Sequence, residues 1–77
     1  MRSRRQPPFQ GSFRQVRGAV VAALRDVRSA TLASLSRTTQ ERLDRVAAAA
    51  RALVAEGLVR ADPAALSGRP AGRVRLA

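Results

Sequence analysis

The chain has 77 residues and carries 15 basic residues, all of them arginine, against five carboxylates, which gives a net charge of +10 at pH 7. A chain this short forms a single domain, and because it has neither cysteine nor histidine, we expect no disulfide, no thiolate nucleophile, no cofactor and no metal site of the usual zinc or iron–sulfur type. No apolar run approaches the roughly 18 residues needed to cross a bilayer, and no signal peptide is evident, so we expect a cytoplasmic protein that does not bind membranes.

The first ten residues predict a flexible arm ahead of the folded domain. They contain three arginines, two prolines and almost nothing that a core could bury. We therefore divide the chain into a basic, proline-containing arm over residues 1–11 and a folded domain over residues 12–77.

The first helix is predicted to begin at Ser12. Ser12 and Gln15 fit a capping box, in which each side chain accepts a hydrogen bond from a free backbone N–H of the other residue. The helix runs to about Asp26, and Gly18 in its interior costs about 1 kcal/mol relative to alanine, which indicates either the close approach of another backbone or a tolerated flaw. The expected apolar stripe consists of Phe13, Val16, Val20, Leu24 and Val27.

Two further helices are predicted in the middle of the chain. The shorter one runs from its cap, Thr31, to about Ser36, with a turn as the alternative because serine and threonine crowd this segment. The longer one begins at a second capping box, Thr38 with Glu41, and carries a favourable i,i+4 pair of Glu41 and Arg45.

The third helix is predicted to end at Gly57, because glycine is the residue best suited to a left-handed C-terminal position. Leu58 is then expected to contact Leu53, as in a Schellman motif. The expected apolar stripe of this helix consists of Leu43, Val46, Ala47, Ala50, Leu53 and Val54.

The last part of the chain predicts two short strands, because residues 58–61 and 73–76 alternate apolar and basic side chains. Residues 62–72 between them contain two prolines and two glycines and predict a long hairpin loop. This order of elements is that of a winged helix-turn-helix domain, a mainly α fold of three helices with a small β-hairpin as its wing. A three-helix bundle with a frayed tail is the alternative.

The charge of the chain favours a polyanionic partner, of which nucleic acid is the commonest. Codon bias in a GC-rich genome accounts for arginine in place of lysine, but not for the threefold excess of basic over acidic residues. The alternative is a basic surface that only keeps the protein soluble. An enzyme is not expected, because general acid–base catalysis would have no His, Cys, Lys or Tyr to use and no glycine-rich phosphate loop is present.

A winged helix-turn-helix domain places the N-terminal residues of its third helix in the major groove and its wing against phosphates or the minor groove. Beyond Arg45, residues 47–50 are all alanine and offer no hydrogen-bond donor to a base, so we expect phosphate contacts and little sequence preference. In the third helix, the candidates for DNA contact are Thr38, Thr39, Arg42 and Arg45. In the wing, they are Arg60, Arg69, Arg73 and Arg75. In the first helix, Arg14 and Arg17 offer phosphate contacts or a docking edge.

The segment FQGSFRQVRG, residues 9–18, resembles the junction that precedes the C-terminal region of A/G-specific adenine DNA glycosylases. The matching positions are Phe9, Gly11, Ser12, Arg14, Gln15, Arg17 and Gly18, followed by ALVAEGLVR at 52–60 and GRVRLA at 72–77. In that family the segment follows the iron–sulfur loop and leads into a winged-helix-like module. Phe13 departs from the family pattern, and the catalytic helix-hairpin-helix region and the four cluster cysteines have no counterpart here.

The resemblance implies a non-catalytic accessory module of base-excision repair, whether as a fragment of a longer enzyme, a split remnant or a stand-alone relative. Its expected partners are double-stranded DNA and a glycosylase catalytic domain, and we expect a monomer. Two alternatives remain. One is a small winged-helix transcriptional regulator, which would normally dimerise on a palindrome; the other is a protein-interaction domain whose first helix docks on a catalytic partner.

Overall fold

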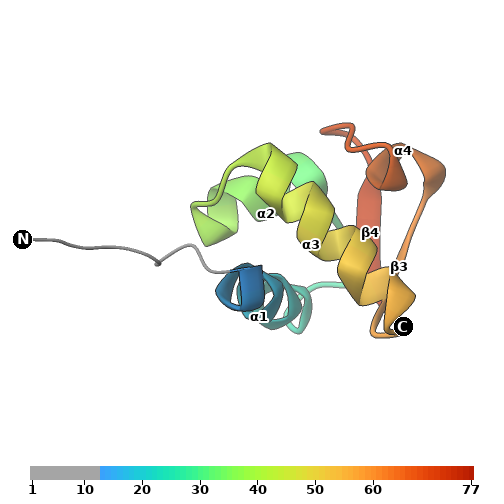
Figure 1. Ribbon diagram of the computed structural model, residues 1–77, viewed down its shortest axis with the longest axis horizontal. Coiled ribbons are helices and arrows are strands. Elements are labelled where there is room, and N and C mark those ends of the chain that lie inside the picture. Colours follow the sequence, from blue (N-terminus) through green and yellow to red (C-terminus); the bar gives the residue numbers. More distant parts are fainter. Residues whose placement is uncertain (1–12) are drawn as a thin grey trace, which may run out of the picture.

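In the computed structural model, which describes residues 13–77, three main helices pack together and against a small antiparallel sheet (Figure 1). The predicted arm and the predicted cap at Ser12 lie outside the described residues. None of the helices in the described part of the chain has the length and apolarity that crossing a bilayer requires. The elements are α1 (Phe13–Leu24), β2 (Ala30–Thr31), α2 (Leu32–Thr39), α3 (Leu43–Ala55), β3 (Val59–Ala61), α4 (Pro63–Leu66) and β4 (Arg73–Leu76).

Helix α1 contributes Val16, Val20 and Leu24 to the core, as its apolar spacing predicts. Two members of the predicted stripe are not in the core, because Phe13 is 44% exposed and Val27 is 49% exposed. The helix ends at Leu24, so Val27 lies in the connection to β2 rather than on the buried face of the helix.

Helix α2 begins where the sequence predicts. The side chain of Thr31 accepts a hydrogen bond from the backbone N–H of Ser34, at 3.1 Å, and so caps the helix. Leu32 and Leu35 are both buried, and this packing on the core stabilises a helix that would be too short to form alone.

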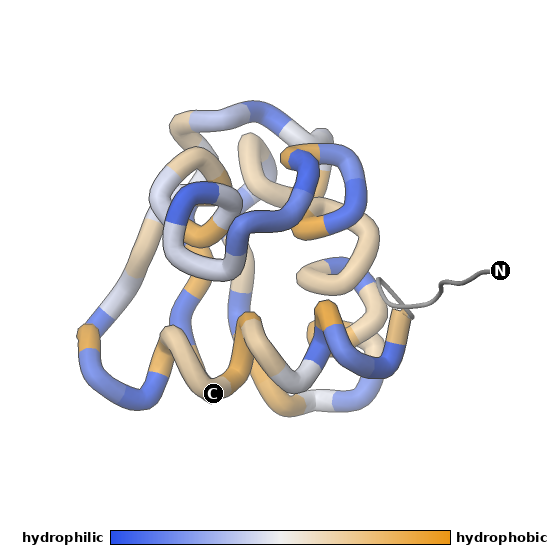
Figure 2. The backbone as a smooth tube through the Cα atoms, turned by 90° about the vertical axis from the view of Figure 1, so that its left-hand side faces the viewer, coloured by the Kyte–Doolittle hydropathy of each residue, from blue (hydrophilic) through white to orange (hydrophobic). Residues whose placement is uncertain are grey.

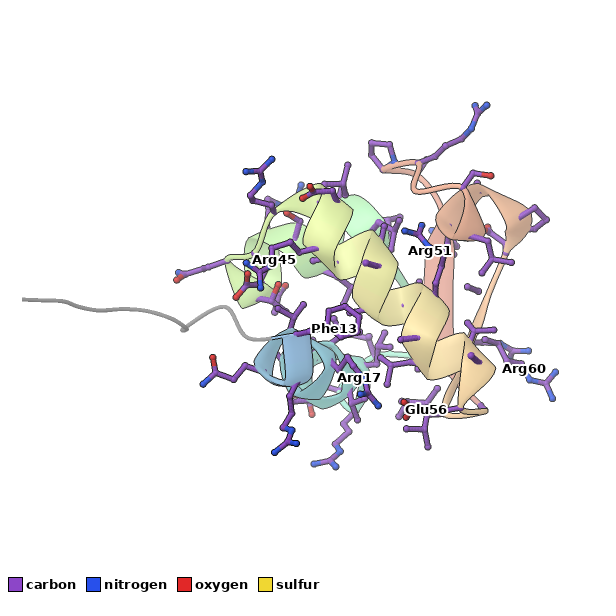
Figure 3. The ribbon with its side chains drawn as sticks, in the orientation of Figure 1. Phe13, Arg17, Arg45, Arg51, Glu56 and Arg60 are labelled. Carbon is purple, nitrogen blue, oxygen red and sulfur yellow. The ribbon has the colours of Figure 1, made fainter. Side chains whose placement is uncertain are left out.

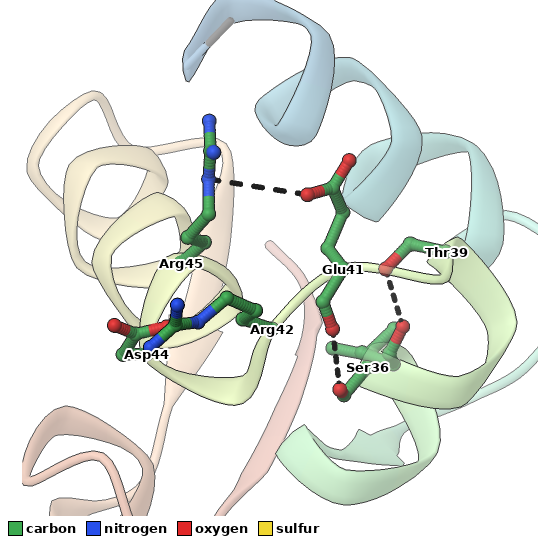
Figure 4. A network of polar contacts seen from close by, with 7 residues as sticks. Ser36, Thr39, Glu41, Arg42, Asp44 and Arg45 are labelled. Atoms are coloured by element: carbon green, nitrogen blue, oxygen red, sulfur yellow. Dashed lines mark hydrogen bonds and ion pairs between the residues drawn. The ribbon is translucent and has the colours of Figure 1, made fainter. Parts of the chain in front are cut away.

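The predicted start of the third helix at Thr38 is wrong, because α2 continues through Thr39. The hydroxyl of Thr39 donates to the carbonyl of Leu35 in the preceding turn of the same helix, at 2.7 Å. Gln40 then ends α2 in the left-handed conformation, with φ of 59°. Helix α3 begins only at Leu43, after an N-cap residue, Arg42, whose side chain makes no capping hydrogen bond. Figure 4 shows this junction.

The end of α3 confirms the predicted Schellman motif. Gly57 adopts a φ of 77°, and its N–H donates to the carbonyl of Val54, while the N–H of Leu58 donates to the carbonyl of Leu53, each at 3.0 Å. These two bonds satisfy carbonyl groups that the helix end would leave without partners. Upstream, alanines 47, 49 and 50 are buried together with Val46 and Leu53, so small side chains allow α3 to pack closely on α1 and α2.

The sheet has the strand order β2-β4-β3, and both pairs are antiparallel. Strands β3 and β4 confirm the two predicted strands. Strand β2 was not predicted, because two residues are too short to show an alternating pattern. Val59 and Val74 point into the core, and the alternation of side chains along a strand therefore turns Arg60, Arg73 and Arg75 to the outer face.

The predicted hairpin loop is instead a folded segment that contains the helical turn α4. Asp62 caps α4: its carboxylate accepts hydrogen bonds from the backbone N–H groups of Ala65 and Arg73, at 2.8 and 3.1 Å. Ala65 is fully buried, and a Cβ at Gly72 would overlap the backbone of Ala65, so only glycine fits there. Aspartate followed by Pro63 is itself a helix-start pattern that could have predicted this turn.

Candidate nucleic-acid interface

The residues predicted to begin the third helix do not form a free cationic surface. Thr38 and Thr39 belong to the last turn of α2, and the hydroxyl of Thr39 is used within that helix. Each arginine at the start of α3 has a carboxylate partner: Arg42 lies 3.4 Å from Asp44, and Arg45 lies 3.9 Å from Glu41 (Figure 4). The second pair confirms the predicted i,i+4 contact. The short connection between α2 and α3, residues 40–42, is hydrophilic (Figure 2).

The solvent side of α3 offers little that could recognise a base. Its exposed residues are Asp44, Arg51 and Ala55. The guanidinium of Arg51 donates to the carbonyl of Leu66 at 3.2 Å and so holds α4 against α3 (Figure 3). One carboxylate, one engaged arginine and otherwise alanines make a poor surface for hydrogen bonds to base edges.

The outer face of the sheet is different, because it carries three arginines that have no carboxylate partner among residues 13–77. Arg60 of β3 lies directly opposite Arg75 of β4, and Arg73 lies two residues before Arg75 on the same face. All three are exposed, and none forms an ion pair within residues 13–77. We call Arg60, Arg73 and Arg75 the sheet arginines. Like charges directly opposite one another destabilise a strand pair, so this arrangement has a cost for folding.

The sheet arginines line an open hollow of about 430 Å³ together with Ser29 and Asp62. The guanidinium of Arg73 donates to the hydroxyl of Ser29 at 3.0 Å, which fixes that side chain at the rim. The same oxygen of Asp62 accepts both of its backbone hydrogen bonds, so this carboxylate serves the cap of α4. Three guanidinium groups around one carboxylate leave the hollow cationic, and guanidinium groups suit phosphate oxygens in charge and geometry.

The remaining predicted residues lie elsewhere. Arg69 is exposed in the turn after α4 and does not line the sheet hollow. Arg14 and Arg17 lie on α1, and Arg17 forms an ion pair with Glu56 at the end of α3. Figure 3 shows the side chains of Arg17 and Glu56 pointing toward one another, and that of Arg60 pointing away from the helices. Of the predicted residues, the structure brings Arg60, Arg73 and Arg75 together around one hollow, and Arg14 and Arg17 together around another. Sequence reasoning missed Ser29, because the short strand that positions it gave no signal.

Comparisons with known proteins leave the function to be inferred from the residues themselves. No family model, no curated protein and no solved structure matches the chain. Two features of the described residues bear most directly on function: the sheet arginines, which form no ion pair there, and the arginines at the start of α3, which do.

Proposed function

We propose that the domain binds double-stranded DNA without catalysing a reaction, mainly through phosphate contacts and with little sequence preference. The observation that carries this proposal is the directly opposed pair of Arg60 and Arg75, with Arg73 beside it, on an exposed face that supplies no ion-pair partner among the described residues. A bound polyanion would relieve the repulsion between these arginines. It would also release condensed counterions from the DNA, which favours binding at low salt.

The arrangement of the elements supports a winged helix-turn-helix type of fold within this proposal. Helix α3 is followed by the antiparallel pair of β3 and β4. Strand β2, which lies between α1 and α2 in the chain, is the third strand of the sheet and pairs with β4. The hairpin would then act as the wing and carry the phosphate contacts. Helix α3 would contribute less than a typical recognition helix, because its solvent side offers one carboxylate and one engaged arginine.

Base-excision repair is the setting that we propose for this DNA binding. It rests on the resemblance of residues 9–18 to the junction in adenine DNA glycosylases, and the module would serve there to hold duplex DNA for a catalytic domain. A palindrome-reading regulator receives less support, because the start of α3 presents paired arginines rather than free donors to base edges.

The proposal is tested by measuring the affinity of the full chain for a random-sequence duplex by fluorescence anisotropy. The double variant Arg60→Ala with Arg75→Ala should lose about tenfold or more in affinity, because two phosphate contacts disappear. The matched control is Arg25→Ala with Arg37→Ala, which removes the same charge from two exposed arginines outside the sheet hollow. Equal losses in the two double variants would show that net charge alone drives binding and would contradict the proposal.

A further inference from the structure

A second hollow, separate from the sheet arginines, lies between α1 and the turn that follows α3. We call it the α1 groove; its volume is about 420 Å³. Its apolar lining comes from Val21, Leu53 and Leu58. Leu58 is 50% exposed, because the Schellman turn at Gly57 places it beside the groove rather than in the core. A large apolar side chain is thus left half in water next to a concave surface.

Gly18 lines the same groove, and no other part of the described domain packs where its side chain would begin. It lies in the interior of α1, where glycine is unfavourable relative to alanine. Apart from its chain neighbours and the backbone of α1 itself, a Cβ built at Gly18 would meet no atom within 4 Å, so the described domain could accommodate a side chain at this position. A side chain here would project into the groove instead. Close approach of a second backbone to α1 is the physical reason that would require glycine.

The charges around the α1 groove define what could occupy it. Arg14 and Arg25 line it, are exposed, and form no ion pair with any described residue. Arg17 also lines it but is paired with Glu56. A second copy of this chain, docked symmetrically, would set the same arginines against one another, and the net charge of +10 opposes such pairing.

We propose that the α1 groove binds an acidic amphipathic helix of a partner protein. Apolar side chains of that helix would cover Leu58 and Val21, its carboxylates would pair with Arg14 and Arg25, and its backbone would pass close to α1 at Gly18. This is the helix-in-groove mode of recognition, in which apolar anchors supply affinity and charge supplies orientation. The inference is independent of DNA binding, because none of the sheet arginines lines this groove.

The probe for this test is a synthetic helical peptide with leucines at i, i+3, i+4 and i+7 and glutamates on its other positions, and the control peptide carries lysine in place of glutamate. Binding to the full chain is followed by NMR chemical shifts. The acidic peptide should shift the resonances of Gly18, Val21 and Leu58, and the basic peptide should shift none of them. No binding of the acidic peptide, or shifts centred on Arg60 and Arg75, would overturn the proposal.

Two variants at Gly18 separate docking from folding. Gly18→Gln should weaken peptide binding by about tenfold or more, since the side chain overpacks the contact, while the fold tolerates it because the space is open. Gly18→Ala should raise the denaturation midpoint of the free domain. Undiminished peptide binding by Gly18→Gln would overturn the proposal. So would a random duplex that shifts the same groove resonances, because the groove would then belong to the DNA interface.

Discussion

The outer face of the sheet and the start of α3 both carry arginines, yet they differ in what those arginines contact. Arg42 and Arg45 each have a carboxylate nearby, whereas Arg60 lies opposite another arginine. A paired arginine must give up or share its partner before it binds a phosphate, while an arginine facing a like charge gains from any anion. We infer that the pairing of the arginines, more than their number, distinguishes the surface proposed to bind DNA.

The largest expected effect is a loss of stability caused by disturbing the packing of α4 against β4, the strand that carries Arg73 and Arg75. Gly72→Ala should destabilise the domain by about 3 kcal/mol, because the added Cβ overlaps the backbone of Ala65 and forces α4 away from the start of β4. Urea denaturation followed by circular dichroism measures this change. Gly57→Ala is a control at which no atom lies near the added Cβ and only the positive φ is strained; an equal or larger loss there would contradict the account.

Reversing the charge of one sheet arginine should raise the stability of the fold and lower its affinity for DNA. Arg60→Glu places a carboxylate opposite Arg75 and should stabilise the fold by about 0.5 to 1 kcal/mol, because a repelling cross-strand pair becomes an attracting one. The same variant should bind a random duplex about tenfold more weakly, or by about 1.4 kcal/mol. Thermal denaturation and anisotropy check the two effects. Loss of stability would show that the two side chains do not repel one another in the native sheet.

The smallest expected effect comes from releasing the arginines at the start of α3. Glu41→Gln with Asp44→Asn removes both carboxylate partners and should tighten binding to a random duplex by about two- to threefold, or about 0.5 kcal/mol, because surface ion pairs of this kind are weak. The control is Asp26→Asn, which changes one charge outside this junction. A tenfold gain in affinity would show that the main DNA-binding surface lies at the start of α3 rather than on the sheet.

Local signals in the sequence predicted much of the fold. The cap at Thr31 and the Schellman motif at Gly57 each depend on a few neighbouring residues, and both are confirmed. The boundary between α2 and α3 was predicted wrongly, because Thr38 also fits a capping box. In the structure α2 ends only at Gln40, which adopts the left-handed conformation although it is not a glycine. Strand β2 was missed because its pairing with β4 joins residues more than forty positions apart.

The candidate site could be predicted only in part for the same reason. The basic residues of the two predicted strands were named, but their register, which sets Arg60 against Arg75, is a property of the paired strands. The α1 groove depends on α1, α3 and the following turn together. From the sequence alone, Gly18 indicated either the close approach of another backbone or a tolerated flaw. The open space around its missing Cβ excludes close packing against another part of the described domain.

The most direct test of the central claim is the salt dependence of binding to a random duplex. It compares Arg60→Ala with Arg75→Ala against Arg42→Ala with Arg45→Ala, two double variants of equal net charge. The slope of log affinity against log salt should fall in magnitude by about 2 for the sheet pair, at about 0.9 per phosphate contact, and by well under 1 for the α3 pair. A larger fall for the α3 pair would contradict the claim that the sheet arginines form the DNA-binding surface.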